Sequence, residues 1–250
     1  MIKFFRQIRK NLMETGRTGK YLKYAIGEII LVVIGILIAL SINNWNQERI
    51  VKQENQVILQ NLNKEFSENL IELDSSMSRF SKVIDGLDKL LKEMRTQDSN
   101  LTEPEFDKLL HKTFVTPNWT PSSFVLVELK NSGALSKLDN NHLKTLLFKW
   151  ERDFDDMKGS NEGYGQYAGE YIEFLTKNGS VRNLDALSES TKNLQKSTIA
   201  RNDPELLKMP EFENRADNFY FLAVNLRGKF QSLREIMTDI IEVSNTELKQ

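Results

Sequence analysis

The residues best suited to chemistry are few in this sequence of 250 residues. It contains no cysteine and only two histidines, His111 and His142, which do not share a metal-binding spacing. Thiolate chemistry and cysteine-ligated zinc are therefore excluded, and histidine-based metal sites and Ser-His-Asp triads have little support. We expect no catalytic residue, no metal site and no cofactor, and we predict that the protein is not an enzyme.

Two other patterns resemble known sites without completing them. The run Asp153-Phe154-Asp155-Asp156 begins like a calcium-binding loop, but Met157 takes its fifth position and glycine is missing from its sixth. The glycine-rich stretch 159–169 follows a predicted helix instead of a strand and lacks the Lys-Ser/Thr pair of a phosphate-binding loop. The acidic run is better explained as a solvated helix face.

Aromatic residues form the most interesting group in the second half of the sequence. Most are spaced three or four positions apart along a predicted helix that glycines loosen, and tyrosine can offer its hydroxyl to a ligand while its ring lines a pocket. Aromatic stripes at this spacing are more often part of a core, and that alternative stays open. The candidate ligand or partner surface consists of Trp150, Tyr164, Tyr167 and Tyr171.

Positive charge is concentrated at the N-terminus. Residues 1–23 contain seven lysines and arginines against Glu14 alone, although the whole sequence has a formal net charge of −1. Apolar residues from Ile2 to Met13 gather on one helical face, which is typical of an amphipathic helix lying in a membrane interface. A nucleic-acid-binding protein would carry its basic residues across a folded face, so we expect an anionic lipid bilayer as partner and no nucleic acid.

Residues 24–45 are predicted to form a transmembrane helix. Between Ala25 and Ile42 only Glu28 and Ser41 are clearly polar, and this run is about as long as a bilayer's hydrocarbon core is thick. The basic residues before it place the N-terminus in the cytoplasm. A cleaved signal peptide is the alternative, because Ala39-Leu40-Ser41 resembles a cleavage site, but the apolar run is longer than a signal core.

Glu28 has two explanations inside this apolar run. It lies in the first turn of the span, where its side chain can extend to the cytoplasmic headgroups. Alternatively it belongs to a packing seam against another helix, because Gly35 and Ala39 form a small-x-x-x-small pair on the same stripe. The candidate membrane packing seam is therefore Glu28, Gly35 and Ala39.

The same region carries a resemblance to a known family. The segments Thr18-Gly19-Lys20-Tyr21, Tyr24 to Ile29, Val32 to Leu40 and Ile42 to Asn46 resemble the N-terminal signature of an uncharacterised family of small single-span membrane proteins of Bacteroidota. Farther on, Leu129 to Leu135 is similar to an element in the middle of that family. The resemblance implies an inner-membrane protein with a periplasmic domain of unknown function, and it supplies no catalytic residues.

The remaining residues, 46–250, are predicted to be a periplasmic helical bundle, so the fold class is all-α. Apolar residues repeat at three and four positions over 48–96 and again from Pro210 nearly to Gln250, as in coiled coils, and we expect these two long helices to pack antiparallel. Between them we predict helices from Thr102 to Thr113, from Ser122 or Ser123 to a stop at Gly133, and from Asn140 to Met157. We expect glycines 159–169 to break or loosen the helix that starts at Asn140 before it resumes at Tyr171. We also expect a short helix at 184–195 and a mobile loop within 178–210.

These predictions favour a membrane-anchored protein that acts through protein-protein interaction, as a scaffold or accessory subunit. Its partner would be a second copy of the chain, giving a homo-oligomer, or another periplasmic or inner-membrane protein. The alternative is a periplasmic bundle that senses a small ligand and signals through a partner. A deep pocket bordered by Tyr164, Tyr167 and Tyr171 would favour that alternative, whereas a core filled with side chains would weaken it.

Overall fold

The computed structural model describes residues 18–96, 100–114, 118–191 and 193–249. Within these ranges the protein is helical and contains no β-strand, which confirms the all-α fold class. The elements are α2 (Thr18–Met94), α3 (Glu103–Lys112), α4 (Phe124–Ser132), α5 (Ala134–Lys137), α6 (Asn141–Asn178), α7 (Val181–Asp185), the 3-10 helices η1 (Glu189–Thr191) and η2 (Pro204–Lys208), and α8 (Pro210–Glu247). They divide into two units, Met1–Val57 and Ile58–Gln250.

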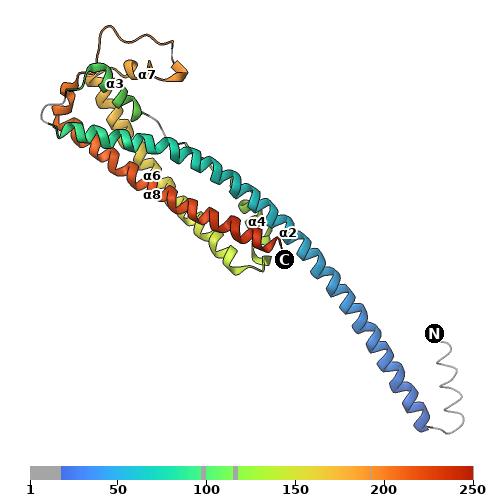
Figure 1. The fold of residues 1–250 in the computed structure, drawn as a ribbon. Helices are drawn as coiled ribbons and strands as arrows, with labels where there is room; N and C mark the ends of the chain where they lie inside the picture. The colour runs from blue at the N-terminus through green and yellow to red at the C-terminus, as the bar shows by residue number, and fades with distance from the viewer. Residues whose placement is uncertain (1–17, 97–99, 115–117, 192, 250) are drawn as a thin grey trace. The chain divides into compact units, whose positions relative to one another are not determined.

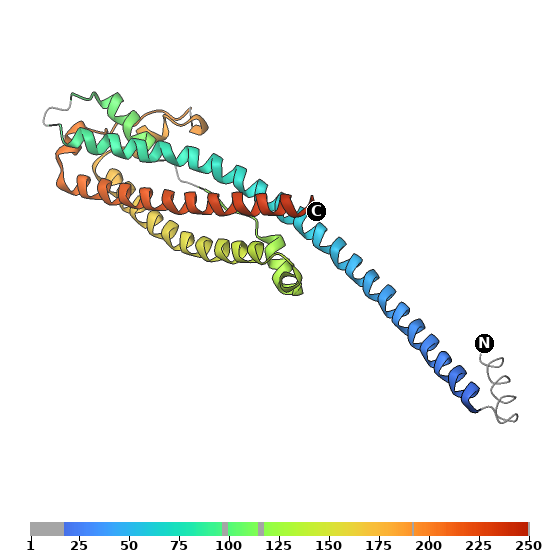
Figure 2. The same cartoon turned by 60° about the horizontal axis from the view of Figure 1, so that its bottom comes forward.

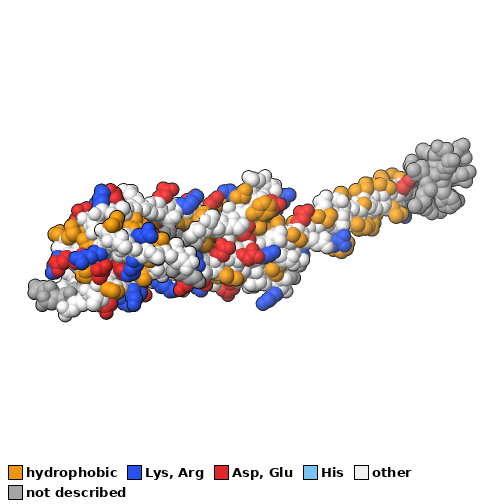
Figure 3. Space-filling model, turned by 90° about the horizontal axis from the view of Figure 1, so that it is seen from above, with side chains coloured by type: hydrophobic (Ala, Val, Ile, Leu, Met, Phe, Trp, Pro, Cys, Tyr) orange, Lys and Arg blue, Asp and Glu red, His pale blue; other side chains and the backbone are white. Residues whose placement is uncertain are grey.

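The described part of the first unit is a stretch of α2. Every residue from Ile29 to Glu54 is exposed, and hydrophobic side chains gather on the apolar N-terminal end of this stretch in Figure 3. One helix among the described residues, α2, is long and apolar enough to cross a membrane, and its apolar part lies near the N-terminus. The interfacial helix predicted for residues 1–23 falls mostly outside the described residues.

Three long helices form the second unit: residues 58–94 of α2, α6 and α8. They lie side by side in Figures 1 and 2. Phe66 of α2 contacts Trp150 of α6, and Phe80 contacts Tyr164, with ring centroids 5.2 Å apart in each pair. Because both contacts advance together along the sequence, α6 runs parallel to this part of α2.

Helix α8 runs antiparallel to both of the others. Asp74 of α2 is paired with Arg234, whereas Asn63, farther toward the N-terminus of α2, donates a hydrogen bond of 3.0 Å to the carbonyl of Ile241. Leucines and aromatic rings at three- and four-residue spacing fill the interface, as expected for long amphipathic helices that are unstable alone in water. The predicted last helix, beginning at Pro210, is confirmed.

The shorter helices follow local sequence signals. At the start of α3, the Glu105 carboxylate accepts a hydrogen bond from the Thr102 amide, and the Thr102 side chain accepts one from the Glu105 amide, as predicted for a capping box. Helix α4 stops at Gly133, whose φ of 72° is a left-handed conformation that glycine adopts without a steric penalty. Both predictions are confirmed.

The predicted interruption of α6 is wrong. Glycines 159, 163, 165 and 169 lie inside one continuous helix from Asn141 to Asn178. Each glycine weakens a helix by about 1 kcal/mol relative to alanine, but the buried residues of the same segment, Met157, Tyr164 and Tyr171, provide contacts that outweigh this cost. Tertiary packing therefore overrides the local preference.

The segment 178–210 also differs from its prediction. The expected helix over 184–195 is replaced by α7, which begins earlier at Val181, and by the single turn η1. Much of the segment is held by side chains: Asn183 and Asn202 are buried, and each accepts a hydrogen bond from a backbone amide. Leu206 and Leu207 of η2 are also buried in the core.

Candidate functional site

The aromatic residues singled out in the sequence lie mostly inside the second unit. Trp150 is 1 % exposed, Tyr164 2 % and Tyr171 0 %, whereas Tyr167 is half-buried. The ring of Trp150 stacks on Phe154 at 5.2 Å between centroids. For the three buried rings, the structure shows the core packing that the sequence had left as the alternative to a ligand surface.

Tyr171 also makes a polar contact inside this core. Thr113, at the end of α3, donates a hydrogen bond of 3.1 Å to the Tyr171 hydroxyl. Burial raises the pKa of Tyr171 and of Tyr164 above the usual value for a phenol. Both phenols are therefore neutral near pH 7, and they serve as packing groups with a polar end.

A polar clamp attaches α4 to α2. Asn69 donates a hydrogen bond to the carbonyl of Ser122 and accepts one from the amide of Ser122, both at 2.8 Å. The Trp119 indole donates to the Asn69 carbonyl at 3.1 Å. Glu65 accepts hydrogen bonds from the Ser122 hydroxyl at 2.9 Å and from the Val125 amide at 3.0 Å. The N-cap residue of α4, Ser123, makes no side-chain cap hydrogen bond, so the Glu65 carboxylate of α2 caps the helix instead.

The clamp holds α4 with apolar side chains directed outward. Leu126 and Leu129 are buried, but Phe124 is 71 % exposed and Val127 is 48 % exposed. Large exposed apolar groups on a folded unit are common at sites of protein contact. These exposed residues could not be told apart from buried ones in the sequence, because Phe124 and Leu126 are equally apolar as residue types.

A second polar network surrounds the buried carboxylate of Asp107 in α3. Its Oδ1 accepts a hydrogen bond of 2.7 Å from Asn202, and its Oδ2 is paired with Lys196 at 2.7 Å. Asn202 in turn accepts from the amide of Ser180 at 2.6 Å. Both carboxylate oxygens of Asp107 and the side-chain amide of Asn202 have partners, and the network joins α3 to the segment that follows α6.

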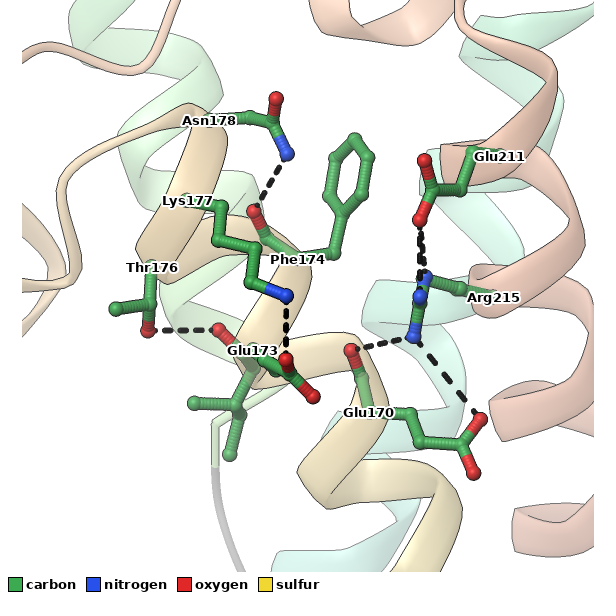
Figure 4. Close-up of polar contacts among 9 residues, drawn as sticks. Glu170, Glu173, Phe174, Thr176, Lys177, Asn178, Glu211 and Arg215 are labelled. Carbon is green, nitrogen blue, oxygen red and sulfur yellow. Dashed lines mark hydrogen bonds and ion pairs between the residues drawn. The ribbon is translucent and has the colours of Figure 1, made fainter.

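Arg215 of α8 joins the C-terminal end of α6 to α8, as Figure 4 shows. Its guanidinium donates to the Glu170 carbonyl at 3.0 Å and to the Glu211 carboxylate at 3.0 Å. Nearby, the hydrogen bond from Lys177 lowers the pKa of Glu173. The groups in Figure 4 are already paired with each other, so we assign them to fold stability.

A shallow groove of about 510 Å³ runs between α6 and α8. We call it the α6–α8 groove, and its lining residues are Asp155, Asp156, Gly159, Ser160, Gly163, Leu222, Asn225 and Lys229. Lys229 is ion-paired with Asp156 across it. Open space surrounds the positions that a Cβ would take at Gly159 and Gly163, so no contact within the described residues requires glycine there. Phe221, one helical turn from Asn225 on α8, is 63 % exposed.

A second groove, of about 450 Å³, has His142, Asn140 and Asp239 among its lining residues. The described residues contain no group of three or more histidine, aspartate or glutamate side chains arranged to hold a metal ion. His111, the other histidine, lies in the last turn of α3. The two histidines are therefore on different helices, α3 and α6.

The candidate membrane packing seam lies in the first unit. Gly35 and Ala39 are exposed, and Glu28 is partly exposed. Nothing lies within 4 Å of a Cβ placed at Gly35, so a neighbouring helix could approach its backbone closely. The three seam residues lie within one α-helix, at positions that share a face.

Comparison with known protein families matches residues 28–153 to a family described as "Family of unknown function (DUF6090)". The matched stretch includes most of the apolar run, the clamp residues Glu65 and Asn69, α3, α4 and the first part of α6. No curated protein and no solved structure matches the chain.

Proposed function

Because the chain belongs to the DUF6090 family of unknown function, we propose from its own residues that it is a single-span membrane protein acting through protein-protein interaction. In this proposal the apolar part of α2 anchors the chain in the cytoplasmic membrane of a Gram-negative cell. The second unit is a periplasmic antiparallel helical bundle that binds a protein partner as a scaffold or accessory subunit.

The membrane part of the proposal is supported by the surroundings of α2. A helix that is apolar on all sides and exposed over its whole circumference is stable in lipid and poorly stable in water. Ile29 to Ile42 meets this description. Seven basic residues precede the run, whereas Arg49 and Lys52 are the basic residues shortly after it. This imbalance favours a cytoplasmic N-terminus.

The interaction part is supported by what fills the interior of the second unit and what is left outside it. Trp150, Tyr164 and Tyr171, which would have lined a sensing pocket, pack against other rings. Large apolar side chains are exposed instead on α4 and beside the α6–α8 groove. This distribution favours binding of a macromolecule on the surface over binding of a small ligand inside.

The glycines of the α6–α8 groove are the single observation that carries the choice of surface. Gly159 and Gly163 weaken α6, yet no neighbour among the described residues needs the space that they leave. A partner whose backbone lies close to α6 would use that space, and exposed Phe221 beside the groove would supply apolar contact area. We propose the α6–α8 groove as the partner-binding surface.

Site-specific photo-crosslinking in living cells tests this assignment. A photoreactive amino acid replaces Phe221 or Asn225 at the groove, and Arg227 serves as the control because it is exposed about 200° around the same helix from Asn225. The proposal predicts a discrete crosslinked product from positions 221 and 225 and little from 227. Equal products from all three positions would contradict a specific surface at the groove.

A further inference from the structure

A regular seven-residue pattern runs along one face of α2 between residues 25 and 57, all within the first unit. In coiled-coil notation, with a and d as the core positions of each heptad, this face has mostly β-branched residues at a and small or polar residues at d. The a positions are Ile29, Ile36, Asn43, Ile50 and Val57, and the d positions are Ala25, Val32, Ala39, Asn46 and Gln53. Parallel two-stranded coiled coils favour β-branched residues at a together with leucine at d, and here the a positions follow that preference while the d positions do not.

This face differs from the one that α2 uses for its own fold. From Leu59 onward the buried residues, which include Leu62 and Phe66, follow a different set of heptad positions. Leu59 lies two positions after Val57, so its spacing does not continue the heptad positions of residues 25–57. Ile50 is 43 % exposed and Val57 is 55 % exposed, and both lie beyond the apolar run. The heptad face therefore presents aliphatic side chains that the described residues leave uncovered.

The charged residues that flank the heptad face can form ion pairs with the same residues of a second, identical chain. Arg49 takes a g position and Glu54 takes the e position five residues later. In a parallel pair of helices, g of one chain faces e in the next heptad of the other, and such pairs set partner and orientation. Two identical chains would thus form the Arg49–Glu54 pair twice. Within one chain, the Arg49 guanidinium lies 5.8 Å from the Trp45 ring centroid and 3.4 Å from the Asn46 side-chain oxygen, which holds it beside this face.

Asn43 indicates how two copies of α2 would align along the heptad face. It is the one polar residue at an a position between 29 and 57. A single asparagine at a pairs best with the same residue of a second chain, and this fixes both the register and the number of chains. In-register parallel pairing is the arrangement that also brings Arg49 to Glu54.

We propose that a second copy of this chain packs parallel to the first along the heptad face of α2, residues 25–57. The inference rests on the proposed function, because copies with one span each, inserted with the same orientation, meet in parallel. The occupant is a second copy because both partners of the charge pair and the register-setting asparagine lie on one face of a single sequence. The candidate seam residues Gly35 and Ala39 then lie at or next to the contact, where they allow close approach of the two backbones.

Disulfide crosslinking of the full chain in its native membranes tests the proposal, since the absence of natural cysteine makes each introduced cysteine unique. Ile50→Cys, Gln53→Cys and Val57→Cys place the thiol on the heptad face, and Glu48→Cys and Lys52→Cys place it at f and c. We expect about fivefold more linked dimer from the first three variants, because thiols at a and d of a parallel pair come within disulfide range. Equal linkage at all five positions overturns the proposal.

Charge exchange provides an independent test with a matched rescue. Arg49→Glu and Glu54→Arg each place like charges opposite one another in a homodimer, and we expect each to reduce the dimer fraction by about threefold or more. Co-expression of the two variants with different tags restores both pairs and should enrich the mixed dimer. If the mixed dimer is no more abundant than either homodimer, the parallel g-to-e pairing is wrong.

The same samples show whether the dimer proposal alone is wrong or the proposed function is wrong as well. A crosslinked product containing a different protein, or a monomer that remains in the membrane after carbonate extraction, overturns the second copy as occupant and leaves the membrane anchor intact. Release of the wild-type chain from the membrane by carbonate overturns the proposed function itself. Circular dichroism of each variant should show wild-type helix content, because all substitutions lie outside the second unit.

Discussion

Asn202 donates a hydrogen bond of 2.7 Å to the buried carboxylate of Asp107, although 95 residues separate them in the sequence. The contact fixes the segment after α7 against α3. Lys196 pairs with the other carboxylate oxygen, but its side chain is half-exposed, so its ion pair is partly screened by solvent. Asn202 and Asp107 are both fully buried.

Asp107→Ala should therefore be strongly destabilising. Removing the carboxylate leaves the buried Asn202 amide without one acceptor, and we expect a loss of about 3 kcal/mol in the free energy of unfolding. Lys196→Ala is the control and should cost about 1 kcal/mol or less. Urea unfolding in detergent, followed by tryptophan fluorescence, measures both. Equal effects would show that the network contributes little beyond the exposed ion pair.

Glu65→Ala should release α4 without unfolding the long helices. The Glu65 carboxylate caps α4 through the Val125 amide, and loss of such a cap costs about 1–2 kcal/mol. Hydrogen exchange should become faster across α4, whereas α6 and α8 keep wild-type protection. Ser132→Ala, at the opposite end of α4, removes the hydrogen bond to the Glu128 carbonyl and the one that Ser132 accepts from the Ala134 amide, neither of which reaches α2. It should leave the amides of the first turns of α4 close to their wild-type exchange rates.

Glycine-to-alanine substitutions should have opposite effects at two positions of α6 and its cap. At Gly159, alanine meets open space, so it should stabilise the fold by about 0.5–1 kcal/mol. At Gly179, a Cβ would lie 2.3 Å from the Asn202 side-chain oxygen, and overpacking should destabilise by about 1–3 kcal/mol. Thermal unfolding of the two variants measures the difference. If the groove is a partner surface, Gly159→Ala should also weaken crosslinking from position 221.

Alkaline pH should unfold the second unit through its buried phenols. Burial raises the pKa of Tyr164 and Tyr171, so their contribution to stability is fully present below the unfolded-state pKa of about 10 and is lost as the pH rises through the higher folded-state values. Each phenol should reduce stability by about 1.4 kcal/mol per pH unit in that window. A Tyr164→Phe, Tyr171→Phe variant should show a shallower decline between pH 10 and 12. An unchanged slope would assign the decline to other groups.

Features with a local cause were predictable from the sequence. The capping box at Thr102, the stop at Gly133 and the start of the last helix at Pro210 each depend on residues within four positions of one another. The interruption at glycines 159–169 was predicted wrongly because propensity counts the weakness of each glycine, whereas the tertiary contacts of Tyr164 and Tyr171 keep α6 continuous.

The polar contacts between distant segments could not be predicted in the same way. Glu65 caps a helix that begins 59 positions later, and Asn202 reaches a carboxylate 95 positions earlier. Neither pair has a sequence spacing that distinguishes it from the many other acidic and amide residues. Gly86 illustrates the same limit: it looks like a weak point of α2, but a Cβ there would lie 3.0 Å from the Cβ of Lys112, so α3 uses the space.

Thiol labelling shows on which side of the membrane each part of the chain lies, and so tests the single span with a cytoplasmic N-terminus. Asn11→Cys and Ser232→Cys each give a single thiol in the otherwise cysteine-free chain, and a membrane-impermeant maleimide is applied to intact and lysed spheroplasts. We expect the full-length chain to be labelled at position 232 in intact spheroplasts and at position 11 only after lysis. Labelling of position 11 in intact spheroplasts, or a shortened soluble product carrying position 232, would contradict a single span with a cytoplasmic N-terminus.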